Sequence, residues 1–500
     1  MNIFRVKSIQ ELQQEARDNE KLKRSIGTPE LIALGVGAII GSGIFVLTGV
    51  AAANYAGPAL TFSFILSGIT AGLAALVYTE MAAMIPVAGS AYTYAYASLG
   101  EIIAWIIGWN IILEYTVASG AVAAGWSGYI TDILRSAGIT LPASLVNSPY
   151  NGGLINLPAV LITALMTLVA VRGTTTSAKT NKIIVAVKIL AILAFLALGI
   201  PRVNPANWRP FLPFGVSGII HGAAIIFFAY IGFDAVSTAA EEVRDPNKNL
   251  PRGIIGSLAI STLLYIAVTI VLTGLVSYTS LNTPSPVTTA LMAAGVRGAS
   301  FIVGSGALAG LTSVLLVTIF AQSRVFLAMG RDGLLPSFFA RVHPRFHTPW
   351  LTTILVGTFV AIIGGFLPIG IIAELANVGT LSAFFTVALG VLILRYTRPE
   401  LERPFKVPFM PWTSLATMVC TIYLFFNLPP LTWLRFAVWM VLGLIVYFLY
   451  SRHHSLLAKS EENPPARPDF LPKFPFKPLF FPRPLSAPLT LRLRMLRRRK

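Results

Sequence analysis

Long apolar segments recur along almost the whole chain, and they limit its fold more than any other feature of the sequence. A helix needs about 20 mainly apolar residues to cross the hydrocarbon core of a bilayer, and runs of about that length follow one another from Leu31 to Tyr450. Only 12% of the residues are charged, compared with about 25% in soluble domains. The sequence therefore predicts an all-α polytopic membrane protein.

Short polar interruptions divide the apolar sequence into twelve expected transmembrane helices. We expect these helices at residues 30–53, 59–84, 101–130, 153–172, 182–201, 214–240, 254–276, 299–329, 350–368, 370–395, 411–428 and 431–450. The chain then divides into a polar segment (1–29), two sets of five helices (30–201 and 202–397), a final helix pair (398–450) and a tail (451–500).

The positions of lysine and arginine predict that both termini are cytoplasmic. These residues are dense in segment 1–29 and in the loops after the fourth, sixth, eighth and tenth spans. The opposite side holds only Arg135, Arg202, Arg209, Arg297 and Arg435. Because cytoplasmic loops of membrane proteins carry the excess of basic residues, this bias orients the chain. Membrane topology, and not nucleic-acid binding, thus explains the net charge of +18.

The tail and the rare residue types exclude other classes of protein. Residues 451–500 are rich in proline and end in basic residues, so we expect a disordered tail that either has no separate function or is attracted to anionic lipid. Cys420 is the only cysteine, which excludes an intramolecular disulfide. The histidines show no metal-binding spacing within the spans, and we expect no metal, no cofactor and no enzymatic activity.

The first span contains the glycine-rich stretch Gly35–Phe45. Each glycine in a helix interior costs about 1 kcal/mol relative to alanine. Broken backbone at mid-membrane depth survives only where protein buries it or where it lines a polar cavity. We therefore expect this stretch to hold a small zwitterion.

The sixth span contains a second glycine-interrupted segment, Phe227–Asp234, with Gly232 among aromatic residues. The first and sixth spans each open a set of five, and paired interruptions at such places indicate a transporter site within an inverted repeat. Half-helix ends offer amide donors for a carboxylate and carbonyl acceptors for an ammonium group. An α-amino acid carries both groups.

Two ionisable residues lie deep inside expected spans. Lys188 has only apolar neighbours in the fifth span, about 9 Å from its cytoplasmic end, which is near the limit of a snorkelling side chain. We favour a function for it, because a buried lysine can load and release a proton as a proton-coupled carrier requires. Glu114 in the third span is equally consistent with accepting a proton, holding a cationic group or being satisfied by polar neighbours. Glu80 is interpreted as a helix-end or inter-helix anchor.

A family resemblance rests on several extended motifs in order along the chain. They are Gly37-Ala38-Ile39-Ile40-Gly41-Ser42-Gly43-Ile44-Phe45, Tyr78-Thr79-Glu80-Met81, Pro86-Val87-Ala88-Gly89-Ser90-Ala91-Tyr92, Gly232-Phe233-Asp234 through Asp245-Pro246, Leu250-Pro251, and Arg324 to Met329 with Arg331 to Pro336. The sequence resembles the amino acid-polyamine-organocation superfamily of transporters, specifically the bacterial relatives of the cationic amino acid transporters. The resemblance runs from about Leu22 to Tyr450.

The resemblance implies a leucine-transporter-like fold, with two inverted repeats of five helices and two further helices, and secondary transport of amino acids. It implies that the amides of Gly41, Ser42 and Gly43 receive the substrate carboxylate, within a binding segment that also includes Ile44. Ser42 replaces a threonine that is common in this motif and keeps the hydroxyl group.

The resemblance also assigns the remaining site residues. The carbonyl groups of Ile39, Phe228, Ala229 and Ile231 would receive the amine, and Phe228 would gate the site from outside. Thr318 would line the side-chain pocket. Lys188 matches a lysine that occupies the sodium position in proton-coupled members, and Glu114 matches an acidic position in the third span.

We therefore predict an amino acid importer of the plasma (inner) membrane that works by proton symport with alternating access. The candidate pocket residues are small or neutral, so neutral substrates are expected at least as readily as cationic ones. The lipid bilayer and the amino acid are the expected partners, nucleic acid is not, and a small membrane subunit is left open. Two alternatives stand: an exchanger in which Lys188 only fixes the inward or outward state, and an amino acid receptor that transports nothing.

Overall fold

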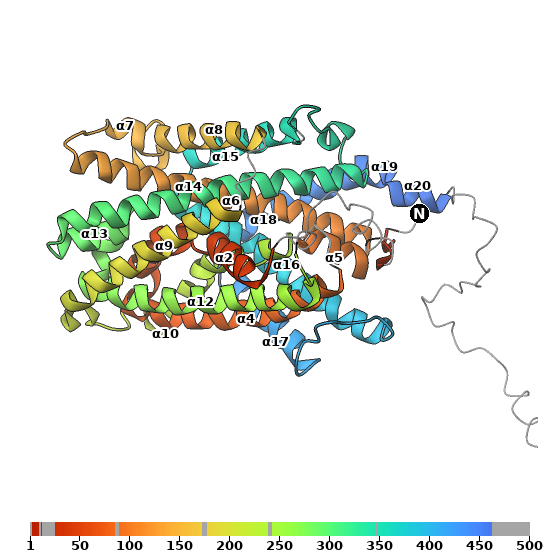
Figure 1. Cartoon of the computed structure of the whole chain (residues 1–500), viewed down its shortest axis with the longest axis horizontal. Helices are drawn as coiled ribbons and strands as arrows, with labels where there is room; N and C mark the ends of the chain where they lie inside the picture. The colour runs from red at the N-terminus through yellow and green to blue at the C-terminus, as the bar shows by residue number, and fades with distance from the viewer. Residues whose placement is uncertain are drawn as a thin grey trace, which may run out of the picture. The chain divides into compact units, whose positions relative to one another are not determined.

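The structure is a computed structural model, and it describes residues 3–9, 12, 26–85, 90–172, 178–238, 243–346 and 348–462. Within these ranges the chain is helical, and an isolated bridge between Ile26 and Val243 is the one β-type pairing (Figure 1). The α-helices are α2 (Thr28–Ile39), α3 (Thr48–Ala51), α4 (Leu60–Met84), α5 (Ser90–Ser98), α6 (Glu101–Ser136), α7 (Ala143–Val146), α8 (Leu157–Val171), α9 (Ala178–Gly199), α10 (Gly215–Ile226), α11 (Ala235–Thr238), α12 (Pro246–Leu275), α13 (Pro286–Ala293), α14 (Arg297–Arg331), α15 (Trp350–Phe366), α16 (Ile369–Thr397), α17 (Trp412–Phe426), α18 (Pro430–Val446), α19 (Arg452–His454) and α20 (Leu456–Glu462). Short 3-10 and π turns lie at η1 (Gly43–Leu47), η2 (Ala52–Ala56), η3 (Gly57–Ala59), η4 (Pro149–Asn151), η5 (Ile200–Arg202), η6 (Pro205–Trp208), η7 (Phe227–Tyr230), η9 (Tyr278–Leu281), η10 (Ser337–Ala340) and η11 (Tyr447–Ser451).

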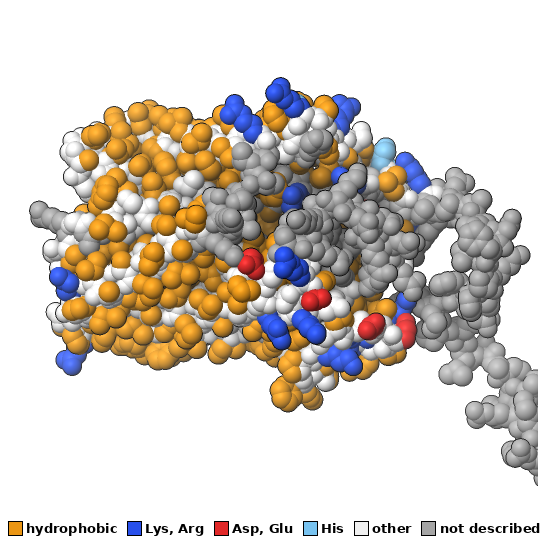
Figure 2. Space-filling view, viewed as in Figure 1, with side chains coloured by type: hydrophobic (Ala, Val, Ile, Leu, Met, Phe, Trp, Pro, Cys, Tyr) orange, Lys and Arg blue, Asp and Glu red, His pale blue; other side chains and the backbone are white. Residues whose placement is uncertain are grey.

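The helices are long and apolar enough for a multi-pass membrane protein. Among the described residues, 7 helical segments meet the length and hydropathy that a membrane crossing requires. These segments are Thr28–Met84, Glu101–Ser136, Ile183–Arg202, Pro246–Leu275, Phe301–Arg331, Ile369–Thr397 and Pro430–Lys459, and shorter apolar helices lie at Leu157–Val171, Gly215–Tyr230, Trp350–Phe366 and Trp412–Phe426. Figure 2 shows one face covered mainly by hydrophobic side chains, with most of the visible charged side chains toward one end. The polytopic prediction is thus confirmed, while the number of twelve spans and the inverted repeat stay predictions.

The described residues up to Lys459 form one compact unit. The long helix α6 packs against α14 and α16, and α12 packs against α2 and α4. Helix α9 contacts both α2 and α14. The first broken helix is therefore enclosed by helices that are distant from it in the sequence.

Both glycine-interrupted segments are breaks in the structure, as their sequences predict. Helix α2 ends at Ile39, and the chain becomes helical again only in the π turn η1. Helix α10 ends at Ile226, continues as the 3-10 turn η7, and leaves regular helix before α11. We refer to residues 37–43, which include the last turn of α2 and the first residue of η1, as the first break, and to residues 227–234 as the second break.

Gly232 shows why the second break needs a residue without a side chain. Its φ angle is +117°, a conformation that side chains disfavour. A Cβ atom at Gly232 would also lie 2.8 Å from the carbonyl carbon and oxygen of Ala38 in α2. Glycine therefore lets the two breaks approach each other.

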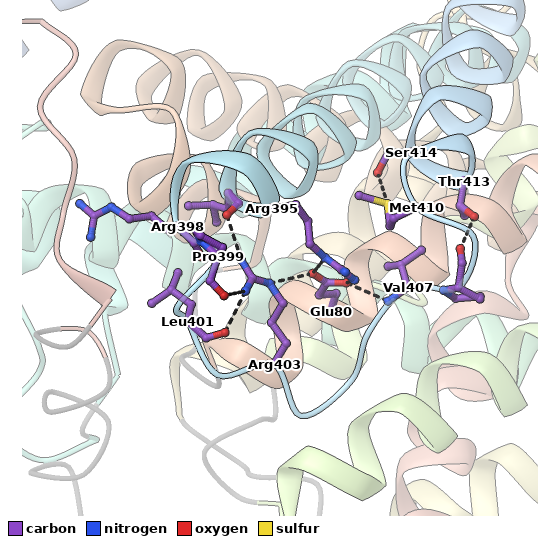
Figure 3. A network of polar contacts seen from close by, with 12 residues as sticks. Glu80, Arg395, Arg398, Pro399, Leu401, Arg403, Val407, Met410, Thr413 and Ser414 are labelled. Carbon is purple, nitrogen blue, oxygen red and sulfur yellow. Dashed lines mark hydrogen bonds and ion pairs between the residues drawn. The ribbon is translucent and has the colours of Figure 1, made fainter. Parts of the chain in front are cut away.

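A buried ion-pair network ties α4 to the end of α16 and to the loop that follows it (Figure 3). The Arg395 guanidinium donates two hydrogen bonds to the Glu80 carboxylate, at 2.8 and 2.6 Å. Arg403 Nε lies 3.3 Å from the same carboxylate, and the Val407 amide donates to it at 2.8 Å. The remaining Arg403 nitrogens donate to the carbonyl oxygens of Leu394, Arg398, Pro399 and Leu401. The interpretation of Glu80 as an inter-helix anchor is confirmed.

Several predicted boundaries differ from the structure. Helix α6 continues to Ser136, six residues past the expected end of the third span at 130. Helical structure also continues past Tyr450 through α19 and α20, so the predicted tail boundary at 451 lies too early. These residues are held because the Ser455 hydroxyl donates to the buried Glu101 carboxylate at 2.5 Å. Residues 13–25 and 463–500, which include most of the polar segment and of the tail, lie outside the described residues.

Candidate functional site

A cavity lies where the two breaks meet. The lining residues come from both breaks, from α6 and from α14. They are Ala38, Ile39, Gly41, Ser42, Gly43, Tyr115, Ala118, Val122, Phe228, Ile231, Gly232, Val314, Val317, Thr318 and Ala321. Segments far apart in the sequence thus form one cavity beside the ends of the two broken helices.

Most of the predicted substrate-binding residues line this cavity. They are Ile39, Gly41, Ser42, Gly43, Phe228, Ile231 and Thr318. Ile44 and Ala229 are buried behind the lining, at 0% and 1% exposure. Ala229 instead packs on the first break, since a Cβ atom at Gly43 would lie only 2.4 Å from the Ala229 Cα atom.

Lys188 reaches the first break from α9. Its ammonium group donates to the carbonyl oxygens of Gly37 at 2.6 Å and Ile40 at 3.2 Å. The side chain is fully buried, and α14 closes over its stem, since a Cβ atom at Gly310 would lie 2.9 Å from the Lys188 Cγ atom. The last carbonyls of a half-helix lack amide partners and carry a partial negative charge, so they are suited to hold a cation.

Tyr265 of α12 joins the two breaks. Its hydroxyl group lies 2.8 Å from the Ile39 carbonyl oxygen and 2.9 Å from the Ala229 carbonyl oxygen. These are two of the carbonyl groups that the resemblance assigns to the substrate amine. A carbonyl oxygen has two lone pairs, so contact with Tyr265 leaves each of them able to accept a second hydrogen bond.

Asn377 of α16 holds the end of α10 just before the second break. Its amide nitrogen donates to the carbonyl oxygens of Ala224 and Ile225, both at 2.8 Å. The side chain is fully buried. The Asn377 Oδ1 atom has no hydrogen-bond partner among the described residues.

The Ser42 hydroxyl is a buried polar group at the cavity that lacks a partner. Ser42 is 1% exposed, and no described residue forms a hydrogen bond with its Oγ atom. Buried hydroxyl groups are nearly always paired, so an exception at a cavity wall indicates a place for a ligand. The first amides of η1, which begins at Gly43, follow directly and have no partner within their own helix.

Glu114 lies close to the site without lining the cavity. It is buried in α6, with 4% of its surface exposed. The next residue, Tyr115, does line the cavity and donates from its hydroxyl to the Asp234 carboxylate at 3.1 Å. The Gly232 amide donates to the other oxygen of Asp234 at 3.2 Å. Asp234 therefore connects α6 to the second break.

Comparison with known proteins identifies the family. A family model described as amino acid permease matches residues 26–449, which is most of the chain. The chain belongs to the amino acid permease family. The resemblance seen in its sequence motifs is thereby confirmed.

Similar relatives of this permease are transport proteins. The permease is 46% identical over 460 residues to a methylthioribose transporter of Bacillus subtilis, which covers 92% of this chain and 100% of that protein. It is 45% identical over 462 residues to the branched-chain amino acid permease BcaP of Bacillus subtilis, covering 91% of this chain and 99% of that protein. It is 38% identical over 388 residues to the vacuolar cationic amino acid transporter 4 of Arabidopsis thaliana, covering 76% of this chain and 64% of that protein. The prediction that the chain is not an enzyme is confirmed by this family.

Sequence patterns did not select Tyr115, Tyr265 or Asn377 in this permease. Each of these polar residues lies within an apolar span, and that position is the only signal the sequence offers for them. Thr318, which the resemblance did select, lines the cavity and accepts a hydrogen bond from the Ser119 hydroxyl at 2.7 Å.

Proposed function

We propose that this permease imports neutral α-amino acids across the plasma membrane by proton symport, with alternating access around the two breaks. The observation that carries the proposal is the placement of the Lys188 ammonium on the carbonyl oxygens of Gly37 and Ile40, directly beside the cavity. We include in the proposal the twelve-helix, leucine-transporter-like arrangement and cytoplasmic termini.

The two ends of the substrate would bind to different groups. The Ser42 hydroxyl and the amides at the start of η1 are hydrogen-bond donors suited to the carboxylate. Carbonyl oxygens at the breaks, including those of Phe228 and Ile231, are acceptors suited to the ammonium group. A small zwitterion fits this pairing because it satisfies donors and acceptors at the same time.

The wall facing the side chain of the substrate supports a neutral amino acid. Ala118, Val122, Val314 and Val317 supply apolar groups, and Thr318 supplies a hydroxyl. No Asp, Glu, Lys or Arg belongs to the cavity lining among the described residues. A charged substrate side chain would lose its hydration there without gaining a partner, which is costly. The relative named as a branched-chain amino acid permease agrees with this preference.

Lys188 would couple the site to protons. Among the described residues, no carboxylate lies within ion-pair distance of its ammonium group. A buried ammonium without a counter-charge is costly, whereas the neutral amine is not, so the side chain can exchange a proton during the cycle. The ammonium form holds the first break most strongly, because hydrogen bonds from charged donors are the stronger ones. Loss of the proton would weaken this hold and free α2 to move.

The test is uptake into proteoliposomes with and without an inward proton gradient. We expect the gradient to drive accumulation of L-leucine in the wild type, and we expect Lys188→Ala to abolish the driven component while the protein still inserts and remains monodisperse. Uptake that is unchanged when the gradient is collapsed would contradict symport. Uptake that requires internal amino acid would support the exchanger, and binding without flux would support the receptor.

A ligand screen by thermal unfolding separates the substrate classes. A ligand that binds only the folded state raises the apparent stability, so the twenty amino acids and methylthioribose can be ranked. We expect neutral aliphatic amino acids to stabilise the permease most. Methylthioribose has neither a carboxylate nor an ammonium group, and stabilisation by it alone would overturn the amino acid proposal.

A further inference from the structure

The two breaks are held in parallel ways by two different kinds of side chain. Helices α2 and α10 each contain 12 residues and each end at a break. Lys188 donates to carbonyl oxygens at the end of α2, and Asn377 donates to carbonyl oxygens at the end of α10. Lys188 lies in α9 and Asn377 lies in α16, which are the last helices of the first and second sets of five that the sequence predicts.

We propose that Asn377 is the counterpart of Lys188, a positioning residue that holds the second break with a group that cannot change its charge. This inference rests on the proposed function, because it assigns Asn377 a part in the same transport cycle. It follows that loss and return of the Lys188 proton release and restore the hold on the first break, while the hold of Asn377 on the end of α10 is the same at every pH.

The geometry fixes which atom of Asn377 faces the backbone. Both carbonyl oxygens accept hydrogen bonds, so only the Nδ2 side of the amide can face them, and a rotated amide would place oxygen against oxygen. The amide has two N–H groups, and the two acceptors use both of them. The end of α10 is further capped by Ser67, whose hydroxyl donates to the Ala223 carbonyl oxygen at 2.8 Å. All of these donors are neutral, in contrast to the ammonium at the first break.

The titratable groups on the surrounding elements have other partners or positions. On α16 itself, Glu374 accepts from the Thr432 hydroxyl at 2.6 Å and lies 3.9 Å from Arg435 of α18. Glu114 is buried in α6, and His221 of α10 faces the Asn427 carbonyl oxygen. Glu80 of α4 binds Arg395 and Arg403, and Asp234 at the second break accepts from Tyr115 and from the Gly232 amide. On α6, Glu101 accepts from Tyr447, and Asp132 pairs with Arg135. No hydrogen bond joins any of them to Asn377.

Hydrogen exchange tests the inference without requiring a known substrate. Backbone amides near each break are measured in the purified full-length protein across a range of pH, as protection factors corrected for intrinsic exchange. In the wild type we expect protection around residues 37–44 to change with pH and protection around residues 224–230 to stay constant. Asn377→Ala should lower protection around 224–230 about fivefold to tenfold at every pH, since it removes two hydrogen bonds to buried carbonyls.

Asn377→Asp gives a more specific test, because it keeps the shape of the side chain and adds a titratable group. Its protonated form can still donate to one carbonyl oxygen, whereas the carboxylate would face two oxygens and be repelled. We expect protection around 224–230 to become pH-dependent in this variant, near the wild-type value in acid and lost in alkali. If Asn377→Ala does not fold, this comparison within one protein still decides the question.

Asn110→Ala is the matched control. Asn110 is equally buried and donates to the Ser382 hydroxyl at 3.2 Å, and its Oδ1 atom is likewise without a partner among the described residues. We expect this control to leave the relative protection of both breaks unchanged. Two results would overturn the inference. One is unchanged protection around 224–230 in Asn377→Ala, and the other is protection around 224–230 that varies with pH in the wild-type protein as it does around 37–44.

Transport measurements then connect the inference to the cycle. With L-leucine as the probe, Asn377→Ala should slow proton-driven uptake and substrate exchange by the same factor, whereas Lys188→Ala should abolish the driven uptake selectively. A change in the ratio of driven uptake to exchange in Asn377→Ala would assign it a coupling role and refute the positioning role. Absence of any amino acid transport by the wild type would refute the proposed function. The hydrogen-exchange measurements would still test the positioning role of Asn377 in that case.

Discussion

Three side chains hold the broken backbone of the permease: Lys188, Asn377 and Tyr265. Each of them reaches carbonyl oxygens at or beside a helix break from a neighbouring helix. A buried carbonyl that loses its donor costs about 1–3 kcal/mol, so these contacts stabilise a backbone geometry that the bilayer would otherwise exclude. At the scale of single residues, the site depends on polar donors that reach backbone from neighbouring helices.

Ser42→Ala tests whether the unpaired hydroxyl serves the substrate. We expect affinity for L-leucine to fall about tenfold or more, because a hydrogen bond to a charged carboxylate contributes about 1.5–3 kcal/mol. Stability without ligand should hardly change, since the hydroxyl has no described partner to lose. Calorimetric titration measures the affinity, and thermal unfolding measures the stability.

The matched control for Ser42→Ala is Ser261→Ala. Ser261 of α12 is fully buried and its hydroxyl is also without a partner among the described residues, but it does not line the cavity. We expect this variant to bind L-leucine as the wild type does. Equal affinities for both variants would show that the Ser42 hydroxyl does not contact the substrate.

At the scale of helices, the two breaks depend on close approach of backbone to backbone. Gly43 packs on Ala229, and Gly232 packs on Ala38. Each break therefore contains a glycine whose missing side chain lets the backbone of the other break come close. Around them, α6 and α14 provide long continuous walls. At this scale, two long helices flank two breaks whose backbones approach each other closely.

Gly232→Ala should separate the two breaks. The new Cβ atom would meet the Ala38 carbonyl at 2.8 Å, and the φ angle of +117° is strained for alanine. We expect loss of substrate-induced stabilisation and of transport, measured by thermal unfolding with L-leucine and by uptake. Gly72→Ala in α4 is the control, because no atom lies within 4 Å of its new Cβ, and normal behaviour is expected there. Wild-type transport by Gly232→Ala would show that the breaks tolerate separation.

The anchor around Glu80 should be among the costliest contacts to remove. Glu80→Ala leaves Arg395 and Arg403 without their shared carboxylate, and breaking a buried ion pair from one side costs about 3–5 kcal/mol. We expect a clear fall in the thermal unfolding temperature in detergent, and a smaller one for Glu80→Gln, which keeps one acceptor. Glu402→Ala, an exposed glutamate in the same loop, should leave the temperature unchanged. A mild effect of Glu80→Ala would mean that helix packing alone holds this end of α16.

At the scale of the whole molecule, the N-terminal segment and the end of the last long helix meet at one place. The Glu101 amide at the start of α6 donates to the Arg5 carbonyl oxygen at 2.8 Å, and the Glu101 carboxylate accepts from Tyr447 and Ser455. Lys7 lies 3.4 Å from Asp332 at the end of α14. Both ends of the compact unit are therefore on the same side of the helical body.

Cysteine labelling tests which side of the membrane this is. The single cysteine makes a cysteine-free background simple, with Cys420→Ser. In it, Lys459→Cys marks the end of the unit, and Tyr150→Cys marks the exposed loop between α6 and α8. We expect a membrane-impermeant maleimide to label position 150 on intact cells and position 459 only after permeabilisation. The opposite pattern would reverse the proposed orientation.

The sequence was sufficient to predict that this is a membrane protein, where its two breaks lie, and that Lys188 lies inside a span. Hydropathy is summed over neighbouring residues, and glycines that interrupt an apolar run are visible in the run itself. Lys188 was recognisable because a charge in an apolar span is costly. Asn377 and Tyr265 could not be recognised from the sequence, because neutral polar residues are common in membrane spans. Such a residue becomes informative only when the groups that accept its hydrogen bonds are known.

The sequence by itself determined that this chain crosses the membrane, where its helices break, and which family it resembles, because each of these depends on residues close together along the chain. The tertiary structure decided what holds the breaks, because the contacts join residues far apart. Tyr265 and Ile39 are separated by 226 positions, and Asn377 and Ala224 by 153. Only packing of the helices brings such donors to the carbonyl oxygens, and the placement of the cavity follows from that packing.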